Sequence, residues 1–108
     1  MENESKIQEM QFIEQNLQSI LMQKQSFQME LGENSAALRE IEKAGDEVYK
    51  IIGQLMIKSD KNKIIEELKN KEKLLDVRLK SLETQEESLL AQSKTIRKQI
   101  IGSEEEEK

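Results

Sequence analysis

Carboxylates and amines are nearly the only reactive side chains in this 108-residue sequence, which has 22 acidic and 17 basic residues but no cysteine and no histidine. Without cysteine there are no thiolate nucleophiles, and without histidine the usual acid/base group and metal ligand of neutral pH is missing. Carboxylates exposed on a helix stay hydrated, whereas catalysis needs a pocket and positioned groups. The four glycines, Gly32, Gly45, Gly53 and Gly102, are isolated and form no phosphate-binding loop. We therefore predict that the chain is not an enzyme and has no catalytic residue, metal site or cofactor.

The composition favours long helices over a compact domain. Apolar residues make up 35% of the chain, charged residues make up 36%, and there is no proline. This supplies too little hydrophobic surface to line a round core, whereas the abundance of Glu, Lys, Gln and Leu is typical of coiled coils rather than disorder. The sequence has no run of about 18 apolar residues, and its amino end is polar, so we expect no membrane span and no secretory signal. We expect a cytoplasmic protein.

The first half of the chain repeats apolar residues at alternating steps of three and four. This spacing, sustained over more than four heptads, predicts a helix over about 5–45 with one face against a partner helix. The seam consists of Met10, Ile13, Leu17, Ile20, Lys24, Phe27, Leu31, Asn34, Leu38 and Ile41. Lys24 and Asn34 either help fix the register against the other helix or are tolerated interruptions whose polar ends reach water, and we favour the second interpretation.

A second helix is predicted over about 61–101, after the N-capping residues Ser59 and Asp60. Its main seam recurs every seven residues at Leu68, Leu75, Leu82, Leu89 and Ile96. A weaker companion row is expected at Ile64, Lys71, Arg78, Gln85, Gln92 and Gln99, with a flanking stripe at Ile65, Leu79 and Ile100. We expect the helix to end at Gly102 and residues 102–108 to form an acidic disordered tail.

The two helices have matching lengths of roughly 40 residues, or about 60 Å each. A connection of about 15 residues between equal helices makes them double back. We therefore predict a mainly α fold, a long antiparallel two-helix coiled coil that forms a single domain over 1–108.

The connection over about 47–58 has the β-branched and aromatic residues of a β-hairpin, with a turn near Gly53 and Gln54. Its apolar residues do not alternate with polar ones, so both faces need cover, and a lone two-stranded hairpin is marginal in water. The alternative is a kink within one continuous helix. We favour a hairpin that oligomerises through Val48, Tyr49, Ile51, Ile52, Leu55, Met56 and Ile57.

The stretch VYKIIGQLMIK, followed by SDKNKIIEELKNKEKLLDVRLKSLETQEESL, resembles the archaeal prefoldin beta subunit. The preceding QMELGENSAALREIEKAGDEVYK is similar to the same family, although Gly45 stands where we would expect proline in several relatives. The resemblance implies an ATP-independent co-chaperone and a hexamer of two alpha and four beta subunits. Single hairpins of the beta type would assemble into a β-barrel platform, and the helical arms would pass unfolded client proteins to a group II chaperonin.

The resemblance also implies that clients bind at the ends of the arms, near the chain termini, where a coiled coil frays. Met10 has an adaptable thioether, and Phe12, Ile100 and Ile101 are the preferred client contacts; packing is the expected role of Ile13, Leu17 and Leu89. The candidate set is Met10, Phe12, Ile13, Leu17, Leu89, Leu90, Ile96, Ile100 and Ile101.

Two other functions are compatible with parts of the sequence. A coiled-coil adaptor or scaffold without chaperone activity would use the same heptads, but it gives no reason for a doubly apolar hairpin. The second helix is basic, which suits nucleic acid, but the chain has a net charge of -5 and only three aromatic residues, Phe12, Phe27 and Tyr49. We therefore expect neither a nucleic acid nor a membrane as a partner.

Overall fold

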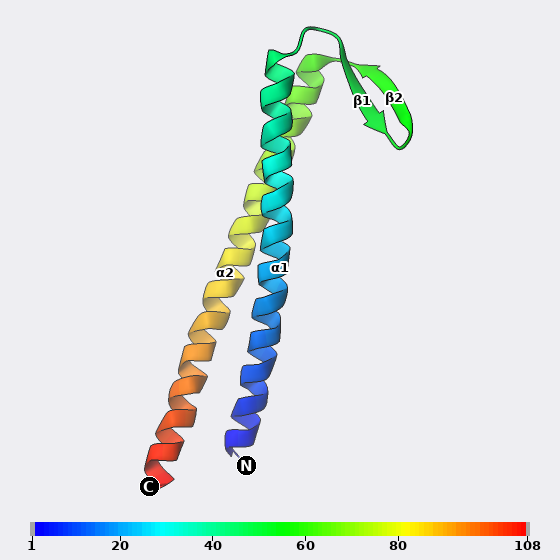
Figure 1. Ribbon diagram of the computed structural model, residues 1–108. Helices are drawn as coiled ribbons and strands as arrows, with labels where there is room; N and C mark the ends of the chain where they lie inside the picture. Colours follow the sequence, from blue (N-terminus) through cyan, green and yellow to red (C-terminus); the bar gives the residue numbers. More distant parts are fainter. Residues whose placement is uncertain (1, 108) are drawn as a thin grey trace. The chain divides into compact units, whose positions relative to one another are not determined.

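The computed structural model describes residues 2–107, which form two helices with a β-hairpin between them (Figure 1). Helix α1 is Glu2–Lys43, strands β1 and β2 are Val48–Ile52 and Leu55–Ser59, and helix α2 is Lys61–Glu107. The chain divides into two compact units. The hairpin unit is Ser26–Leu79, and the terminal unit holds the chain up to Gln25 and from Lys80 onward. In each unit a segment of α1 lies antiparallel to a segment of α2, so the predicted mainly α fold is confirmed.

The buried face of α1 follows the predicted seam. In the terminal unit, Ile13 and Ile20 are buried and Met10, Leu17 and Lys24 are half-buried. In the hairpin unit the predicted positions are likewise buried or half-buried, at Phe27, Leu31, Asn34, Leu38 and Ile41. The alternation of three and four steps thus identifies the inward face of α1 residue by residue.

The main seam of α2 is confirmed, but its predicted companion row is wrong. The predicted row is exposed at Lys71 and Arg78 in the hairpin unit and at Gln85, Gln92 and Gln99 in the terminal unit. The buried or half-buried companions are instead Ile65, Glu72 and Leu79 in the hairpin unit and Glu86, Ser93 and Ile100 in the terminal unit. The observed row faces inward because it buries more hydrophobic surface. It carries three apolar residues, whereas the predicted row carries only one, Ile64.

The two polar residues of the α1 seam were predicted to reach water. In the structure, both of them contact α2 instead. Asn34 is only 4% exposed, and its Nδ2 donates a hydrogen bond of 2.8 Å to the carbonyl oxygen of Leu68 on α2. In the terminal unit, the half-buried Lys24 pairs with Glu86 at 3.3 Å. Each polar residue therefore contacts a particular position on α2, as register-setting polar residues in coiled coils do.

The hairpin closes as predicted through a two-residue turn, and the helical kink is excluded. The strands pair antiparallel from Val48 opposite Ser59 to Ile52 opposite Leu55. Within the described residues only Gly53 has a positive φ, of 61°. The turn residues are Gly53 and Gln54, and only the first has a positive φ. This combination matches a type II′ turn, whose twist suits paired strands.

The helix ends differ slightly from the prediction. Helix α1 ends at Lys43, two residues before the predicted end at about residue 45. Just after this end, the Lys61 Nζ donates a hydrogen bond of 2.7 Å to the Ala44 carbonyl oxygen. The Asp60 carboxylate accepts a hydrogen bond from the Asn62 backbone N–H, as a helix N-cap does. Helix α2 continues to Glu107, which corrects the predicted disordered tail at 102–108; Lys108 lies outside the described residues. A single glycine costs a helix only about 1 kcal/mol, and glutamate favours helices.

Replacing Gly53 with alanine should destabilise the hairpin. A Cβ there meets no atom within 4 Å, so the effect is conformational, and the left-handed backbone should cost about 1–2 kcal/mol. Urea unfolding of the full chain should show a lower midpoint. The matched control is Gly32→Ala within α1, which should raise the free energy of unfolding by about 1 kcal/mol and so raise the midpoint. A neutral or stabilising Gly53→Ala would contradict the turn assignment.

Replacing Asn34 with leucine should raise the free energy of unfolding by about 1 kcal/mol. The Asn34 Oδ1 is buried with no hydrogen-bond partner among the described residues, and leucine removes that unsatisfied atom while adding apolar area to the seam. Asn34→Ala, which leaves a cavity, should lower it. If Asn34→Leu lowered the urea midpoint, the hydrogen bond to Leu68 would outweigh the burial of the amide, contrary to our reading.

Candidate binding surfaces

The hairpin exposes nearly all of its apolar side chains. Tyr49, Ile51, Ile52, Leu55, Met56 and Ile57 are between 46% and 70% exposed, whereas Val48 is buried by its own chain. Because cross-strand partners share a face, one face carries Tyr49, Ile51 and Met56 and the other carries Ile52, Leu55 and Ile57. Both faces of the hairpin are therefore apolar and available to a partner.

The two strand edges are also unpaired within the described residues, since the sheet has only two strands. In a hairpin closed by a two-residue turn, the pair beside the turn exchanges hydrogen bonds and the next pair points its backbone groups outward. The register therefore directs the N–H and C=O groups of Tyr49, Ile51, Met56 and Lys58 away from the hairpin. Ile51 and Met56 thus offer an apolar side chain and an open strand edge together.

The base of the hairpin is held to the helices of its own unit. Val48 lines an apolar groove of about 440 Å³ together with Ala37, Ile41, Ala44 and Ile64. On β1, the Lys50 Nζ lies 3.1 Å from a carboxylate oxygen of Glu67 on α2. Both side chains of this ion pair are about half exposed, so it contributes little to stability. Burial of Val48 is the stronger contact.

The nine predicted client-binding residues all lie in the terminal unit, but only three are open to a client. Phe12, Leu90 and Ile101 are 65%, 51% and 50% exposed. Ile13 is buried, and the remaining five are half-buried in the helix seam: Met10, Leu17, Leu89, Ile96 and Ile100. The expected packing role of Ile13, Leu17 and Leu89 agrees with this burial, whereas Ile100 is less accessible than expected.

The sequence interpretation missed Leu21, which is 50% exposed. Leu21 lines a groove of about 240 Å³ with Leu17 and Leu90. The sequence feature that could have identified it is the adjacent pair Ile20 and Leu21. Adjacent residues on a helix do not share a face, so when Ile20 fills the seam Leu21 must lie beside it. Leu21 therefore gives Leu90 an apolar neighbour on the opposite helix.

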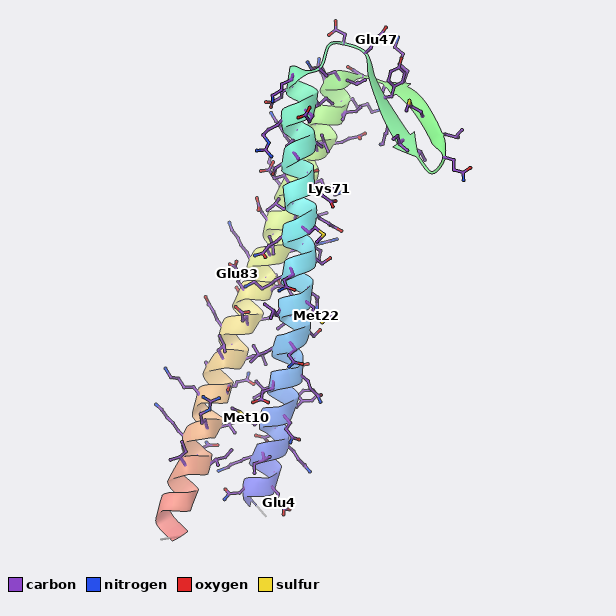
Figure 2. All side chains as sticks on the ribbon, viewed as in Figure 1. Glu4, Met10, Met22, Glu47, Lys71 and Glu83 are labelled. Carbon is purple, nitrogen blue, oxygen red and sulfur yellow. The ribbon has the colours of Figure 1, made fainter. Side chains whose placement is uncertain are left out.

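The seam of the terminal unit is weakly packed. Ser93 is buried where a large apolar residue would fill a coiled coil, and its Oγ lies 3.6 Å from the Met10 sulfur. Figure 2 shows Met10 on the side of α1 that faces α2. Together with the Lys24–Glu86 pair, this leaves less apolar area to hold the helices together. Glu86 and Ser93 are thus two seam positions of α2 at which this unit covers polar side chains.

The described residues were searched for clusters of metal-ligating side chains and for helices that could span a membrane. Among the side chains described, those of residues 3–102, His, Cys, Asp and Glu nowhere gather in threes to hold a metal ion. Neither described helix has an apolar stretch long enough to cross a bilayer. Neither feature is found there.

The comparisons with known proteins identify the family. A family model described as "Prefoldin subunit" matches residues 4–103. The prefoldin subunit beta of Thermococcus onnurineus is 46% identical over 89 residues, covering 81% of this chain and 77% of that protein. The prefoldin subunit beta of Methanosarcina acetivorans is 35% identical over 99 residues, covering 90% and 85%.

A crystal structure shows the same fold. The prefoldin beta subunit from Thermococcus strain KS-1 superimposes with a TM-score of 0.87 and 38% identity, over 94% of this chain and 91% of that one. The sequence match and the fold match thus agree. The chain belongs to the prefoldin family of co-chaperones, and its relatives are archaeal beta subunits.

Proposed function

We propose that this chain is a beta-type prefoldin subunit that assembles through its hairpin and holds non-native polypeptides with its terminal unit. The observation that carries the proposal is the hairpin, which exposes six apolar side chains on two faces. Fully burying one such side chain is worth about 1.5–3 kcal/mol, so several subunits sharing these faces gain considerably. The relatives' name, "Prefoldin subunit beta", agrees with a chain that works as part of an assembly.

The assembly we propose is a hexamer of two alpha-type and four beta-type subunits. Neighbouring hairpins would join edge to edge, so that the outward backbone groups of Ile51 and Met56 pair in a β-barrel platform. The apolar faces would then be buried inside the platform or under it. This arrangement removes the open edges that would otherwise invite aggregation.

Client capture would use the exposed apolar residues Phe12, Leu90 and Ile101. Each patch is small, but several subunits in one particle raise the effective concentration of binding sites around a single client. The chain contains no phosphate-binding loop, so capture and release would be independent of ATP. We infer transfer to a group II chaperonin by competing affinity, in the cytoplasm.

Placing lysines on the hairpin should disrupt the assembly. In Ile51→Lys/Met56→Lys, two charges on neighbouring strand positions would have to be buried between subunits. Analytical ultracentrifugation should show the monomer mass of 12.6 kDa, with helical content retained. Leu74→Lys, on an exposed apolar residue of α2, is the matched control and should assemble as the wild type does. Assembly of the double variant at wild-type mass would rule out the hairpin as the joint.

Polar residues at the exposed apolar positions should abolish holding of clients. The triple variant Phe12→Ser/Leu90→Ser/Ile101→Ser should lose most suppression of aggregation of a thermally unfolded enzyme, because the apolar contact area is gone. Light scattering measures the suppression, and sedimentation should show an unchanged assembly. Met29→Ser, at an equally exposed methionine of the hairpin unit, is the control and should keep full activity. Undiminished suppression by the triple variant would contradict the assignment and favour an adaptor without chaperone activity.

A further inference from the structure

One face of the terminal unit carries a continuous groove that is almost free of charge. Three adjoining hollows of about 480, 430 and 490 Å³ share lining residues, Ser88 between the first two and Gln92 and Ile96 between the last two. Of the 18 residues that line them, only Glu9 is charged. In a chain with 36% charged residues, an uncharged strip of this length is a specific chemical feature.

Side-chain amides are the first component of this groove. They come from both helices, and the α2 members occupy the row that the sequence had wrongly assigned to the seam: Gln8, Asn16 and Gln23 on α1, and Gln85, Gln92 and Gln99 on α2. The row that contains Ser93 and Ile100 faces α1 instead, so the glutamine row lies along the groove and is exposed. Each amide offers both hydrogen-bond donors and an acceptor.

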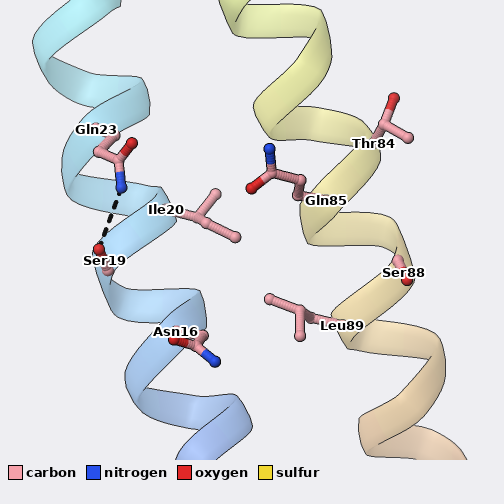
Figure 3. Close-up of a pocket in the computed structure, with 8 residues that line it drawn as sticks. All are labelled: Asn16, Ser19, Ile20, Gln23, Thr84, Gln85, Ser88 and Leu89. Atoms are coloured by element: carbon pink, nitrogen blue, oxygen red, sulfur yellow. Dashed lines mark hydrogen bonds between the residues drawn. The ribbon is translucent and has the colours of Figure 1, made fainter.

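Hydroxyl groups and an apolar floor complete the groove. The hydroxyls are Ser5, Ser19, Thr84, Ser88 and Thr95, and the floor is formed by Phe12, Ile13, Ile20, Leu89 and Ile96. Figure 3 shows Ile20 and Leu89 directed toward each other between the helices, with Gln85 directed toward α1. The groove therefore combines apolar contact at its base with hydrogen-bonding groups along its rims.

Several of these polar groups are available to a ligand. Gln23 donates to Ser19 at 3.2 Å, and the Thr84 and Thr95 hydroxyls donate to backbone carbonyls of their own helix. Asn16 and Gln92 make no side-chain hydrogen bond to residues 3–102, whose side chains the structure describes. The groove keeps unused donors and acceptors on both rims.

We infer that this groove binds an extended segment of unfolded polypeptide through its backbone. This inference deepens the proposed function and rests on it. A backbone is uncharged and carries one donor and one acceptor per residue whatever the sequence, which complements an uncharged rim of amides and hydroxyls. Folded helices have already satisfied their backbone groups, so they match this rim poorly.

The groove dimensions fit a short extended segment. Thr84 to Gln99 spans about 23 Å at 1.5 Å per helical residue, which accommodates about seven residues of extended chain at 3.3 Å each. Alternate side chains of that segment would lie on the apolar floor. The groove thus adds sequence-independent binding to the side-chain contacts of Phe12, Leu90 and Ile101.

The test uses the assembled full-length protein and two fluorescein-labelled peptides. One is an end-capped octapeptide of alternating valine and threonine, and the other is the same peptide with alternate backbone nitrogens methylated. Fluorescence polarisation should show about tenfold weaker binding of the methylated peptide, because its N–H donors are lost although its apolar area has grown. The variant Asn16→Ala/Gln92→Ala should bind the unmethylated peptide about tenfold more weakly.

The controls separate this inference from the proposed function. The control variant Gln15→Ala/Lys94→Ala changes exposed residues close to Asn16 and Gln92 in the sequence but outside the groove. It should bind the peptide as the wild type does. Equal binding of both peptides, or unaltered binding by Asn16→Ala/Gln92→Ala, would overturn the inference even if the protein suppresses aggregation. A changed particle mass in that variant would assign the groove to contacts between copies and would also overturn it. If the wild-type protein neither bound the unmethylated peptide nor suppressed aggregation, the proposed function itself would be overturned.

Discussion

The rest of the structure depends on the hairpin, whose two apolar faces and two open edges cannot be satisfied within one chain. Its own helices bury Val48 but leave Ile51 and Met56 among the most exposed apolar residues of the described chain. A two-stranded sheet with such surfaces is unstable in water and prone to pair with other strands. Assembly with other subunits through the hairpin, as proposed, would cover these surfaces, and it would make folding of the hairpin and formation of the particle parts of one process.

The helices meet different requirements in the two units. In the hairpin unit the seam contains Leu75 and Leu79, both buried, and the hydrogen bond from Asn34 to Leu68 relates one helix to the other. In the terminal unit the seam includes Ser93 and the Lys24–Glu86 pair, which reduce apolar burial. The terminal unit, where polypeptides are proposed to bind, thus has polar side chains at seam positions on both helices.

Much of this could be predicted from the sequence, and the errors have physical reasons. The α1 seam and the turn at Gly53 follow from local spacing and backbone preference. The α2 companion row was misassigned because rows beginning at Ile64 and Ile65 lie next to each other on the helix, and only the larger apolar area of the second turns it inward. The role of Asn34 depends on a carbonyl 34 residues away, which periodicity does not reveal. The groove was missed because the seven-residue spacing of Gln85, Gln92 and Gln99 was assigned to the seam, whereas these residues are exposed.

Hydrogen exchange of the backbone amides over residues 48–59, in the assembled full-length protein, tests the central claim most directly. The account predicts slow exchange at Tyr49, Ile51, Met56 and Lys58, whose outward N–H groups have no partner in a single hairpin and are protected only if another strand covers them. Exchange at these four positions as fast as in an unstructured peptide would show that the hairpin edges stay open to water. The hairpin would then not be the joint between subunits.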